Sequence, residues 1–209
     1  MDRVNGAAEP GFPYHFRAGA GGPRCPTLLL LPSSGGDATD LVNLGRGLAD
    51  EANLLCPRGP AQRPEAGQEH AADPLIRTGQ VAELVSAAAT QHDFDRRQVV
   101  AVGLSDGATL AASLLLRRPR TLLGAVLLHP LATVPPVRLP DLRGVPVFIG
   151  AGRGDALVPE AETLRLAELL LDAGAEVTLS WHPGGHAVAD ASFRSARTWL
   201  RLTGLISQP

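Results

Sequence analysis

A run of strand residues, a glycine-flanked serine and the start of a helix follow one another in residues 98–115, QVVAVGLSDGATLAASLL. Residues 98–102 are β-branched and apolar, as expected of a short buried strand. From Ala108 onwards, small and apolar residues recur at helical spacing. The pentapeptide between the two, Gly103–Gly107, has the Gly-x-Ser-x-Gly pattern of a nucleophile elbow. A tight strand-to-helix turn leaves no space for side chains at its two glycines, so we expect both to lie against the neighbouring strand and helix.

Ser105 is the predicted nucleophile of this turn. The same pentapeptide also fits an ordinary glycine-bounded loop before a helix, but the strand before it and the helix after it favour the elbow. A serine hydroxyl becomes a good nucleophile only when a positioned base takes its proton and an acid orients that base. The chain should therefore supply an acid and a histidine after later strands, in the order Ser, Asp or Glu, His.

Each of these two partners follows a later predicted strand. Residues 145–150 predict a strand, and the loop after it contains one carboxylate, Asp155. Asp155 also fits a turn or a helix cap, but its place in the order favours the catalytic acid. Residues 176–181 predict the next strand, which runs into His182 and then into a Gly-Gly loop that ends at His186. We expect His186 to be the base, because that loop lets its imidazole reach Ser105, and His182 to be a structural histidine.

An oxyanion hole needs the backbone N–H after the nucleophile and a second N–H from the loop after an early strand. Asp106 supplies the first amide. Residues 27–31 predict an apolar strand, which runs into the loop PSSGGD at residues 32–37. We predict the amide of Ser34 as the second donor, and a plain Gly/Ser turn before the next helix is the alternative for this loop.

These stretches together resemble the small carboxylesterase and phospholipase branch of the α/β-hydrolases, which also contains acyl-protein thioesterase-like enzymes. The resemblance spans nearly the whole chain, and besides the elbow it is carried by LLLPSSGGD at 29–37, LLCPRG at 54–59, DALVP at 155–159 and WHPGGH at 181–186. It implies an α/β-hydrolase fold: a doubly wound, mostly parallel sheet with helices on both faces and no separate cap domain. It also implies ester chemistry by a Ser105, His186 and Asp155 triad, with no cofactor.

Two positions depart from the pattern of that branch. Pro32-Ser33 stands where the branch usually has His-Gly, and Asp106 stands where it usually has Gln, Asn or Met. Pro32 removes a hydrogen-bond donor and stiffens the loop. A carboxylate at 106 would oppose a developing oxyanion if it pointed inward, whereas a helix N-terminus favours it if it points outward. Both departures predict low or selective activity, and they leave a catalytically weak small-molecule-binding protein as an alternative.

The composition fits one α/β domain that comprises residues 1–209. Hydrophobic residues make up 44% of the chain and the net charge is −2, which is ordinary for a globular protein. All 19 basic residues are arginine and they are scattered, so we expect no nucleic-acid partner, and Schiff-base chemistry on lysine is excluded. No apolar run approaches the roughly 20 residues that span a bilayer, and the first residues contain no apolar signal core. We therefore expect a cytoplasmic protein.

The remaining cysteines and histidines favour simple interpretations. Two cysteines, Cys25 and Cys56, are too few for a disulfide framework, so free thiols are expected. His70, His92 and His129 lack partners at metal-ligand spacing, which predicts no metal site. His129, at a predicted strand end, is expected to line the pocket.

A long irregular segment, residues 57–74, follows a strand end on the expected catalytic side and precedes a helix predicted over 78–91. It either covers the active site or forms a solvated surface loop. The sequence as a whole predicts a serine hydrolase that cleaves carboxylic esters or thioesters of short to medium acyl chains. An acyltransferase that uses the same triad is the other catalytic alternative, and a homodimer is left open as the oligomeric state.

Overall fold

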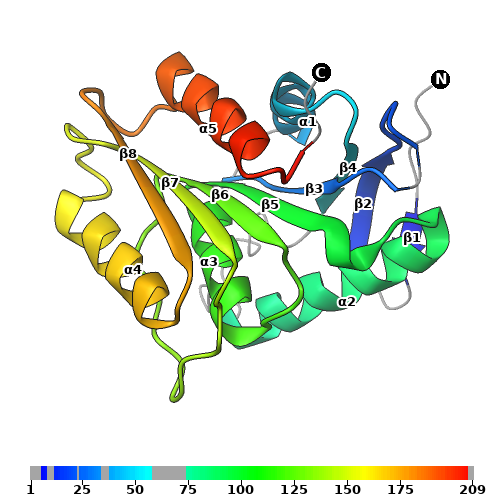
Figure 1. The fold of residues 1–209 in the computed structure, drawn as a ribbon, viewed down its shortest axis with the longest axis horizontal. Helices are drawn as coiled ribbons and strands as arrows, with labels where there is room; N and C mark the ends of the chain where they lie inside the picture. The colour runs from blue at the N-terminus through cyan, green and yellow to red at the C-terminus, as the bar shows by residue number, and fades with distance from the viewer. Residues whose placement is uncertain (1–5, 9–11, 23, 34–37, 58–73, 207–209) are drawn as a thin grey trace, which may run out of the picture.

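The computed structural model describes residues 6–8, 12–22, 24–33, 38–57 and 74–206. Their strands form one eight-stranded sheet in the order β1-β2-β4-β3-β5-β6-β7-β8 (Figure 1). Strands β3 to β8 pair in parallel, whereas β1 and β2 lie antiparallel at one edge. The strands are β1 (Gly6–Ala8), β2 (Phe12–Arg17), β3 (Thr27–Leu31), β4 (Asn53–Pro57), β5 (Val99–Leu104), β6 (Gly124–Leu128), β7 (Pro146–Gly152) and β8 (Glu176–His182).

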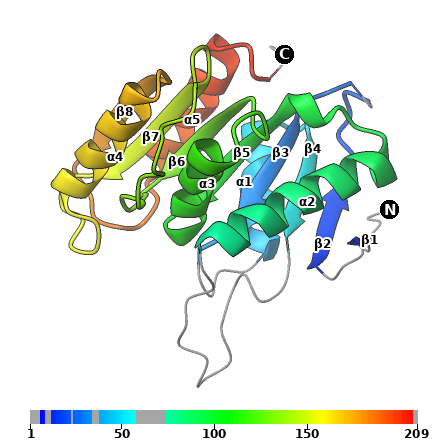
Figure 2. The ribbon, with the colours of Figure 1, turned by 90° about the horizontal axis from the view of Figure 1, so that it is seen from below.

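Helices cover both faces of this sheet (Figures 1 and 2). Helices α1 and α5 pack on one face, and α2, α3 and α4 pack on the other. None of the helices in the described part of the chain is long and apolar enough to cross a membrane. The helices are α1 (Ala38–Leu48), α2 (Pro74–His92), α3 (Asp106–Arg117), α4 (Glu160–Asp172) and α5 (Asp190–Leu202), with a short 3₁₀ turn at Arg96–Gln98. The predicted doubly wound, mostly parallel architecture is confirmed.

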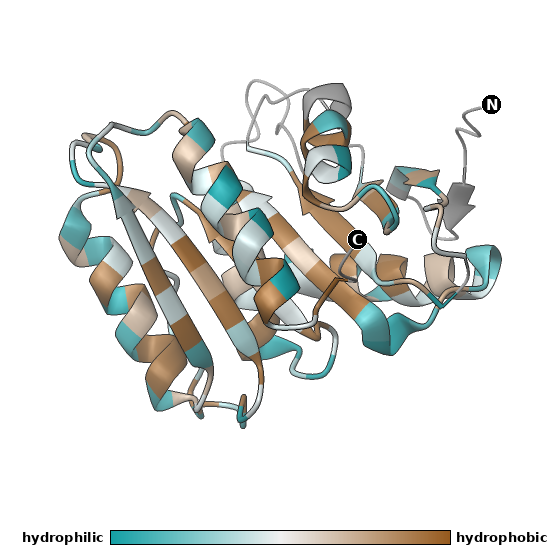
Figure 3. Cartoon of the chain, turned by 45° about the horizontal axis from the view of Figure 1, so that its top comes forward, coloured by the Kyte–Doolittle hydropathy of each residue, from teal (hydrophilic) through white to brown (hydrophobic). Residues whose placement is uncertain are grey.

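Strand β3 shows why the central strands are continuously apolar. Every residue of Thr27–Leu31 is buried. Leu28 and Leu30 pack toward α1 and α5, while Leu29 and Leu31 pack toward α2 and α3. Because both faces of a parallel sheet are covered by helices, its strands lack the alternation of polar and apolar residues that marks a half-exposed strand. Figure 3 shows many apolar residues along the central strands, whereas the edge strand β8 alternates between apolar and polar residues.

The sequence predictions differ from the structure mainly at the edges of elements. The strand at 27–31 lies where it is predicted. Helix α2 begins at Pro74, four residues before the predicted start, because proline is well suited to the first turn of a helix, where its missing N–H leaves no hydrogen bond unmade. The rest of the long irregular segment, residues 58–73, lies outside the described residues. Cys25 and Cys56 are both buried, and no disulfide joins them.

The two glycines of the elbow lie against backbone atoms, as their positions in the turn predict. A Cβ atom at Gly103 would lie 2.5 Å from the Cα of Ala108, and one at Gly107 would lie 2.0 Å from the carbonyl oxygen of Leu31. Backbone atoms cannot move aside as the end of a flexible side chain can. The close approach of α3 to β5 therefore depends on Gly103, and the close approach of α3 to β3 depends on Gly107.

Replacing Gly107 by alanine is expected to lower the free energy of unfolding by about 3 kcal/mol, at or above the upper end of ordinary overpacking costs. Gly79→Ala is the matched control, because Gly79 is also in a helix but its Cβ would meet only the end of the Arg118 side chain, at 3.2 Å. That control should be neutral or stabilising by about 0.5–1 kcal/mol. Denaturant unfolding measures both values, and equal stabilities for the two variants would contradict the packing described for the elbow.

Candidate active site

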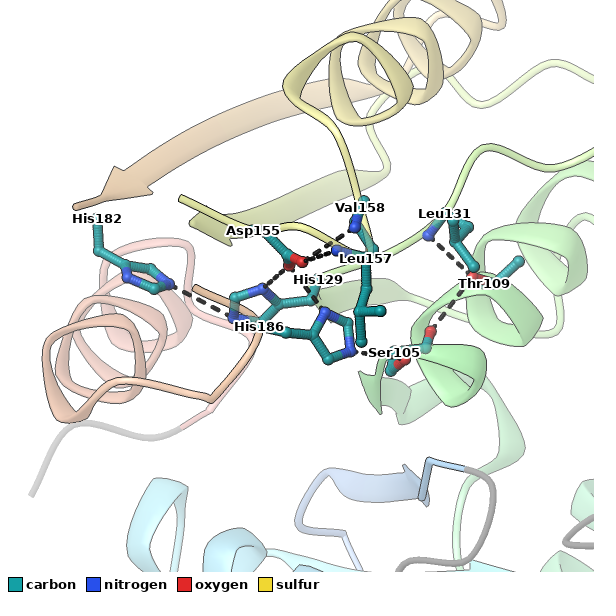
Figure 4. Close-up of polar contacts among 9 residues, drawn as sticks. All are labelled: Ser105, Thr109, His129, Leu131, Asp155, Leu157, Val158, His182 and His186. Carbon is teal, nitrogen blue, oxygen red and sulfur yellow. Dashed lines mark hydrogen bonds and ion pairs between the residues drawn. The ribbon is translucent and has the colours of Figure 1, made fainter. Parts of the chain in front are cut away.

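Polar side chains gather where four neighbouring parallel strands end. Ser105 follows β5, His129 follows β6, Asp155 lies in the loop after β7, and His186 lies in the loop after β8. Parallel strands have their carboxyl ends at the same edge of the sheet, so side chains far apart in the sequence meet there. Figure 4 shows these four residues, together with His182, in one connected group. The structure thus brings together Ser105, Asp155 and His186, the three residues predicted from the sequence.

Ser105 has the strained backbone expected of the elbow. Its φ and ψ angles are 50° and −115°, a conformation that costs a residue with a side chain on the order of 1–3 kcal/mol. The backbone N–H of Ser105 donates to the carbonyl of Leu128 at 2.8 Å, which joins the turn to β6. A serine before a helix commonly caps it, but Ser105 makes no such bond to the described amides of α3. Its Oγ lies instead 3.1 Å from Nε2 of His186.

His186 connects the serine to the acid. Its Nδ1 lies 2.8 Å from Oδ2 of Asp155. An ionised carboxylate only accepts hydrogen bonds, so Nδ1 carries the proton and Nε2 is free to accept the proton of the serine hydroxyl. The His186 side chain is 28% exposed, which leaves it open to a substrate. The arrangement has the hydrogen bonds of a Ser-His-Asp triad.

The loop that contains His186 is hydrogen-bonded to the loop that contains Asp155. The N–H of Gly154 donates to the carbonyl of Gly184 at 3.0 Å. Gly152 approaches the same carbonyl so closely that a Cβ atom there would lie 2.4 Å from its oxygen. These contacts fix the acid and the base relative to each other through their backbones.

Asp155 is buried and fully hydrogen-bonded. Its Oδ1 accepts the backbone N–H groups of Leu157 and Val158, each at 2.9 Å, so the turn-forming role weighed for this residue is also present. Its Oδ2 accepts from His186 and, at 2.9 Å, from Nδ1 of His129. Burial raises the pKa of Asp155, but the hydrogen bonds outweigh it and hold the pKa at about 2. The carboxylate is therefore ionised throughout the physiological range.

This depressed pKa predicts how the fold responds to acid. In the unfolded chain Asp155 titrates near the ordinary value of about 3.9. The ionised group therefore stabilises the folded state at any pH above that value, and the contribution is lost as the pH falls toward the folded-state pKa of about 2. We expect the free energy of unfolding of Asp155→Asn to fall less steeply with decreasing pH across this interval than that of the wild type. Urea unfolding at several pH values measures the slopes, and parallel curves would contradict the expectation.

His129 takes a position that the sequence did not indicate, whereas His182 is a hydrogen-bonded structural histidine, as expected. His129 does not line an open pocket, because it is 1% exposed and hydrogen-bonded to Asp155. His182 is buried as well, and its Nε2 lies 3.4 Å from Nε2 of His129. No sequence spacing around a single histidine at a strand end indicates that it will contact Asp155. The topology could have indicated it, because His129 follows β6 and therefore lies at the same edge of the sheet as Ser105 and Asp155.

Among the described residues, His129, Asp155 and His186 are the one group whose ligand atoms lie close enough to hold a metal ion, within 4.8 Å of one another. In the structure both histidine Nδ1 atoms are at hydrogen-bond distance from the same Asp155 oxygen. A metal ion at this place would have to replace both hydrogen bonds. In the structure the three side chains form a hydrogen-bonded network.

Of the two predicted oxyanion-hole donors, one lies in the described part of the chain. Asp106 is the first residue of α3, so its backbone N–H lies at the positive end of that helix, and the residue is exposed. Ser34, the predicted second donor, lies outside the described residues. Beside the elbow the structure has a mainly apolar cavity, lined by Leu31, Pro32, Pro57, Arg77, Val81, Asp106, Gly107 and Leu110.

Known proteins with similar sequences and structures share this fold. The sequence model of the dienelactone hydrolase family matches residues 57–199. The protein MhqD of Bacillus subtilis (strain 168), whose name describes a hydrolase, is 38% identical over 183 residues, which are 83% of this chain and 92% of MhqD.

Two crystal structures of carboxylesterases are also similar. The Bacillus cereus carboxylesterase has a TM-score of 0.86 and 34% identity over 93% of this chain and 96% of its own. The Mesorhizobium loti carboxylesterase has a TM-score of 0.76 and 30% identity over 90% of this chain and 94% of its own. The α/β-hydrolase fold expected from the resemblance is thereby confirmed. With the family match covering more than half of its length, the chain belongs to the dienelactone hydrolase family of ester-hydrolysing enzymes.

Proposed function

We propose that this enzyme is a serine hydrolase that cleaves carboxylic esters or thioesters of short to medium acyl chains through an acyl-enzyme on Ser105. The observation that best supports this proposal is the continuous set of hydrogen bonds from Ser105 Oγ through His186 to Asp155, at 3.1 and 2.8 Å. Nucleophile, base and orienting acid are the parts that serine-based acyl transfer requires.

The first half of the proposed reaction forms the acyl-enzyme. Ser105 Oγ attacks the acyl carbon while Nε2 of His186 takes the hydroxyl proton, and the carbonyl electrons move to the oxygen. As the tetrahedral intermediate collapses, the bond to the leaving alcohol or thiol breaks and His186 returns the proton to it. The ionised Asp155 holds Nδ1–H of His186 and stabilises the imidazolium that forms.

The second half releases the acid by the same steps with water as the nucleophile. His186 takes a proton from the water, whose oxygen attacks the ester carbon, and gives it to Ser105 Oγ as the acyl–oxygen bond breaks. We assign the backbone N–H groups of Asp106 and Ser34 to the oxyanion. The position of Asp106 at the N-terminus of α3 supports its part, because the helix dipole favours negative charge there.

An exposed apolar side chain beside the serine supports a small acyl group as the bound part of the substrate. Leu157, which is 69% exposed, extends from the Asp155 loop in the direction of Ser105 (Figure 4). An exposed leucine at such a place can contact an acyl chain without first unfolding a lid.

Turnover of p-nitrophenyl esters from acetate to palmitate, with Ser105→Ala as the background, tests the proposal. We expect kcat/KM to be highest for acyl chains of short or medium length and to be absent in the variant. A strong preference for palmitate would contradict the proposed chain length, and a folded wild-type enzyme without turnover on any ester would favour the small-molecule binder. Added alcohols distinguish the acyltransferase, which would form a new ester in place of the acid.

A further inference from the structure

His129 is held in an unusual conformation directly behind the site. Its φ angle is 54°, in the left-handed region that residues with a side chain seldom adopt. The backbone N–H of His129 donates to the carbonyl of Gly150 at 2.8 Å, which joins the end of β6 to β7. This kink turns the imidazole toward Asp155, where it is 1% exposed. Strained and buried polar residues persist where the surrounding structure holds them in place, and they are concentrated at functional sites.

The hydrogen bonds of two buried histidines determine which ring nitrogens carry protons. The N–H of Gly184 donates to Nδ1 of His182 at 3.1 Å, so in the neutral ring Nε2 of His182 carries the hydrogen. That Nε2 lies 3.4 Å from Nε2 of His129, which must then accept. The hydrogen of neutral His129 is consequently on Nδ1, at 2.9 Å from Oδ2 of Asp155. Figure 4 shows this chain from His182 through His129 to Asp155.

Burial favours the neutral form of His129 that this chain requires. Desolvation lowers the pKa of His129, and it outweighs the opposite effect of the neighbouring Asp155 carboxylate. The titratable groups that face His129 are Asp155, His182 and His186. A neutral imidazole provides one directed N–H to the carboxylate without neutralising its charge, whereas an imidazolium would compete with His186 for that charge.

We propose that His129 is a positioning residue for catalysis, which acts through Asp155. The Nδ1–H of His129 donates to Oδ2 of Asp155, the same oxygen that orients His186. This hydrogen bond fixes the rotamer of Asp155 and sets how much of the negative charge on Oδ2 is available to His186. This inference rests on the proposed function. His182 sets the tautomer of His129, so the site contains a second histidine branch in addition to the branch that leads to Ser105. The two branches meet at one carboxylate oxygen.

Two variants at position 129 separate positioning from mere packing. His129→Asn keeps an N–H donor near the place of Nδ1, and asparagine tolerates a positive φ. His129→Leu removes the donor but keeps apolar volume. Without the donor, Oδ2 of Asp155 interacts more strongly with the His186 imidazolium, so the protonated form of His186 is favoured. The acid limb of the kcat/KM profile should therefore move to higher pH.

For His129→Leu we expect a fall in kcat of about tenfold or more with little change in KM, together with the shifted acid limb. His129→Asn should retain most of kcat and the wild-type acid limb. His92→Leu is the matched control: His92 is a partly buried histidine that bonds to Tyr14, away from the site, so its replacement should leave the profile unchanged. An unshifted acid limb in His129→Leu, or equal losses in the leucine and asparagine variants, would overturn the proposal.

A measurement on the unmodified enzyme keeps this test independent of turnover and of the folding of any variant. ¹⁵N NMR of histidine-labelled protein at neutral pH is expected to show His129 as the neutral Nδ1–H tautomer and His182 as the neutral Nε2–H tautomer. A charged His129, or the Nε2–H tautomer, would overturn the proposal. If the wild type cleaves no ester, the proposed function fails while the NMR result still decides the role assigned to the N–H of His129.

Discussion

Replacing Ser105 by alanine is expected to lower kcat/KM for p-nitrophenyl acetate by about 10⁴-fold or more. The reason is that the hydroxyl oxygen which would form the acyl-enzyme is lost, while the backbone of the elbow is held by the bond from Ser105 N–H to Leu128 and by both glycines. The folded state should persist, and Tm measured beside the activity verifies that.

Ser86→Ala is the matched control for this loss. Within the described part of the chain, the hydroxyl of Ser86 bonds to the carbonyl of Ala82 in its own helix, on an exposed surface. Its removal should change neither activity nor stability by a measurable amount. A Ser105→Ala enzyme with wild-type turnover would mean that the hydrolysis uses another nucleophile.

Replacing His186 by alanine is expected to cause a loss of similar size, about 10⁴-fold or more in kcat/KM. Without the imidazole nothing takes the proton of Ser105 Oγ, and the ionised Asp155 loses the donor at 2.8 Å. His92→Ala removes a histidine from the end of α2, where the ring contacts Tyr14 and Phe16, and it should leave turnover unchanged. Retained activity in His186→Ala, with the fold intact, would exclude this histidine as the base.

The positions of Ser105, Asp155 and His186 could be predicted because each lies in a glycine-containing turn or loop that follows a predicted strand. Ser105 and His186 are 81 residues apart in the sequence, yet the order of serine, acid and histidine on successive strand ends was enough to bring them together. The elbow glycines were predictable for a steric reason, since a Cβ at either one would collide with backbone.

The histidine branch was not predictable, because tautomers depend on contacts that no sequence spacing expresses. His129 and His182 are 53 residues apart, and their contact arises only when β6 and β8 lie on either side of β7. The three-residue strand β1 was also missed: GAA carries no alternation, and its pairing with β2 comes from the position of the sheet edge. The amide of Ser34 stays a prediction.

The most direct test of the account is to map where a fluorophosphonate probe binds covalently. The tryptic peptide 98–117 contains both Ser105 and Ser113, so fragmentation within this peptide must distinguish the two. We predict one adduct per chain, on Ser105 Oγ, absent from Ser105→Ala and formed far more slowly in His186→Ala. A folded wild-type enzyme that stays unlabelled, or that is labelled at another residue, would contradict the claim that Ser105 is an activated nucleophile.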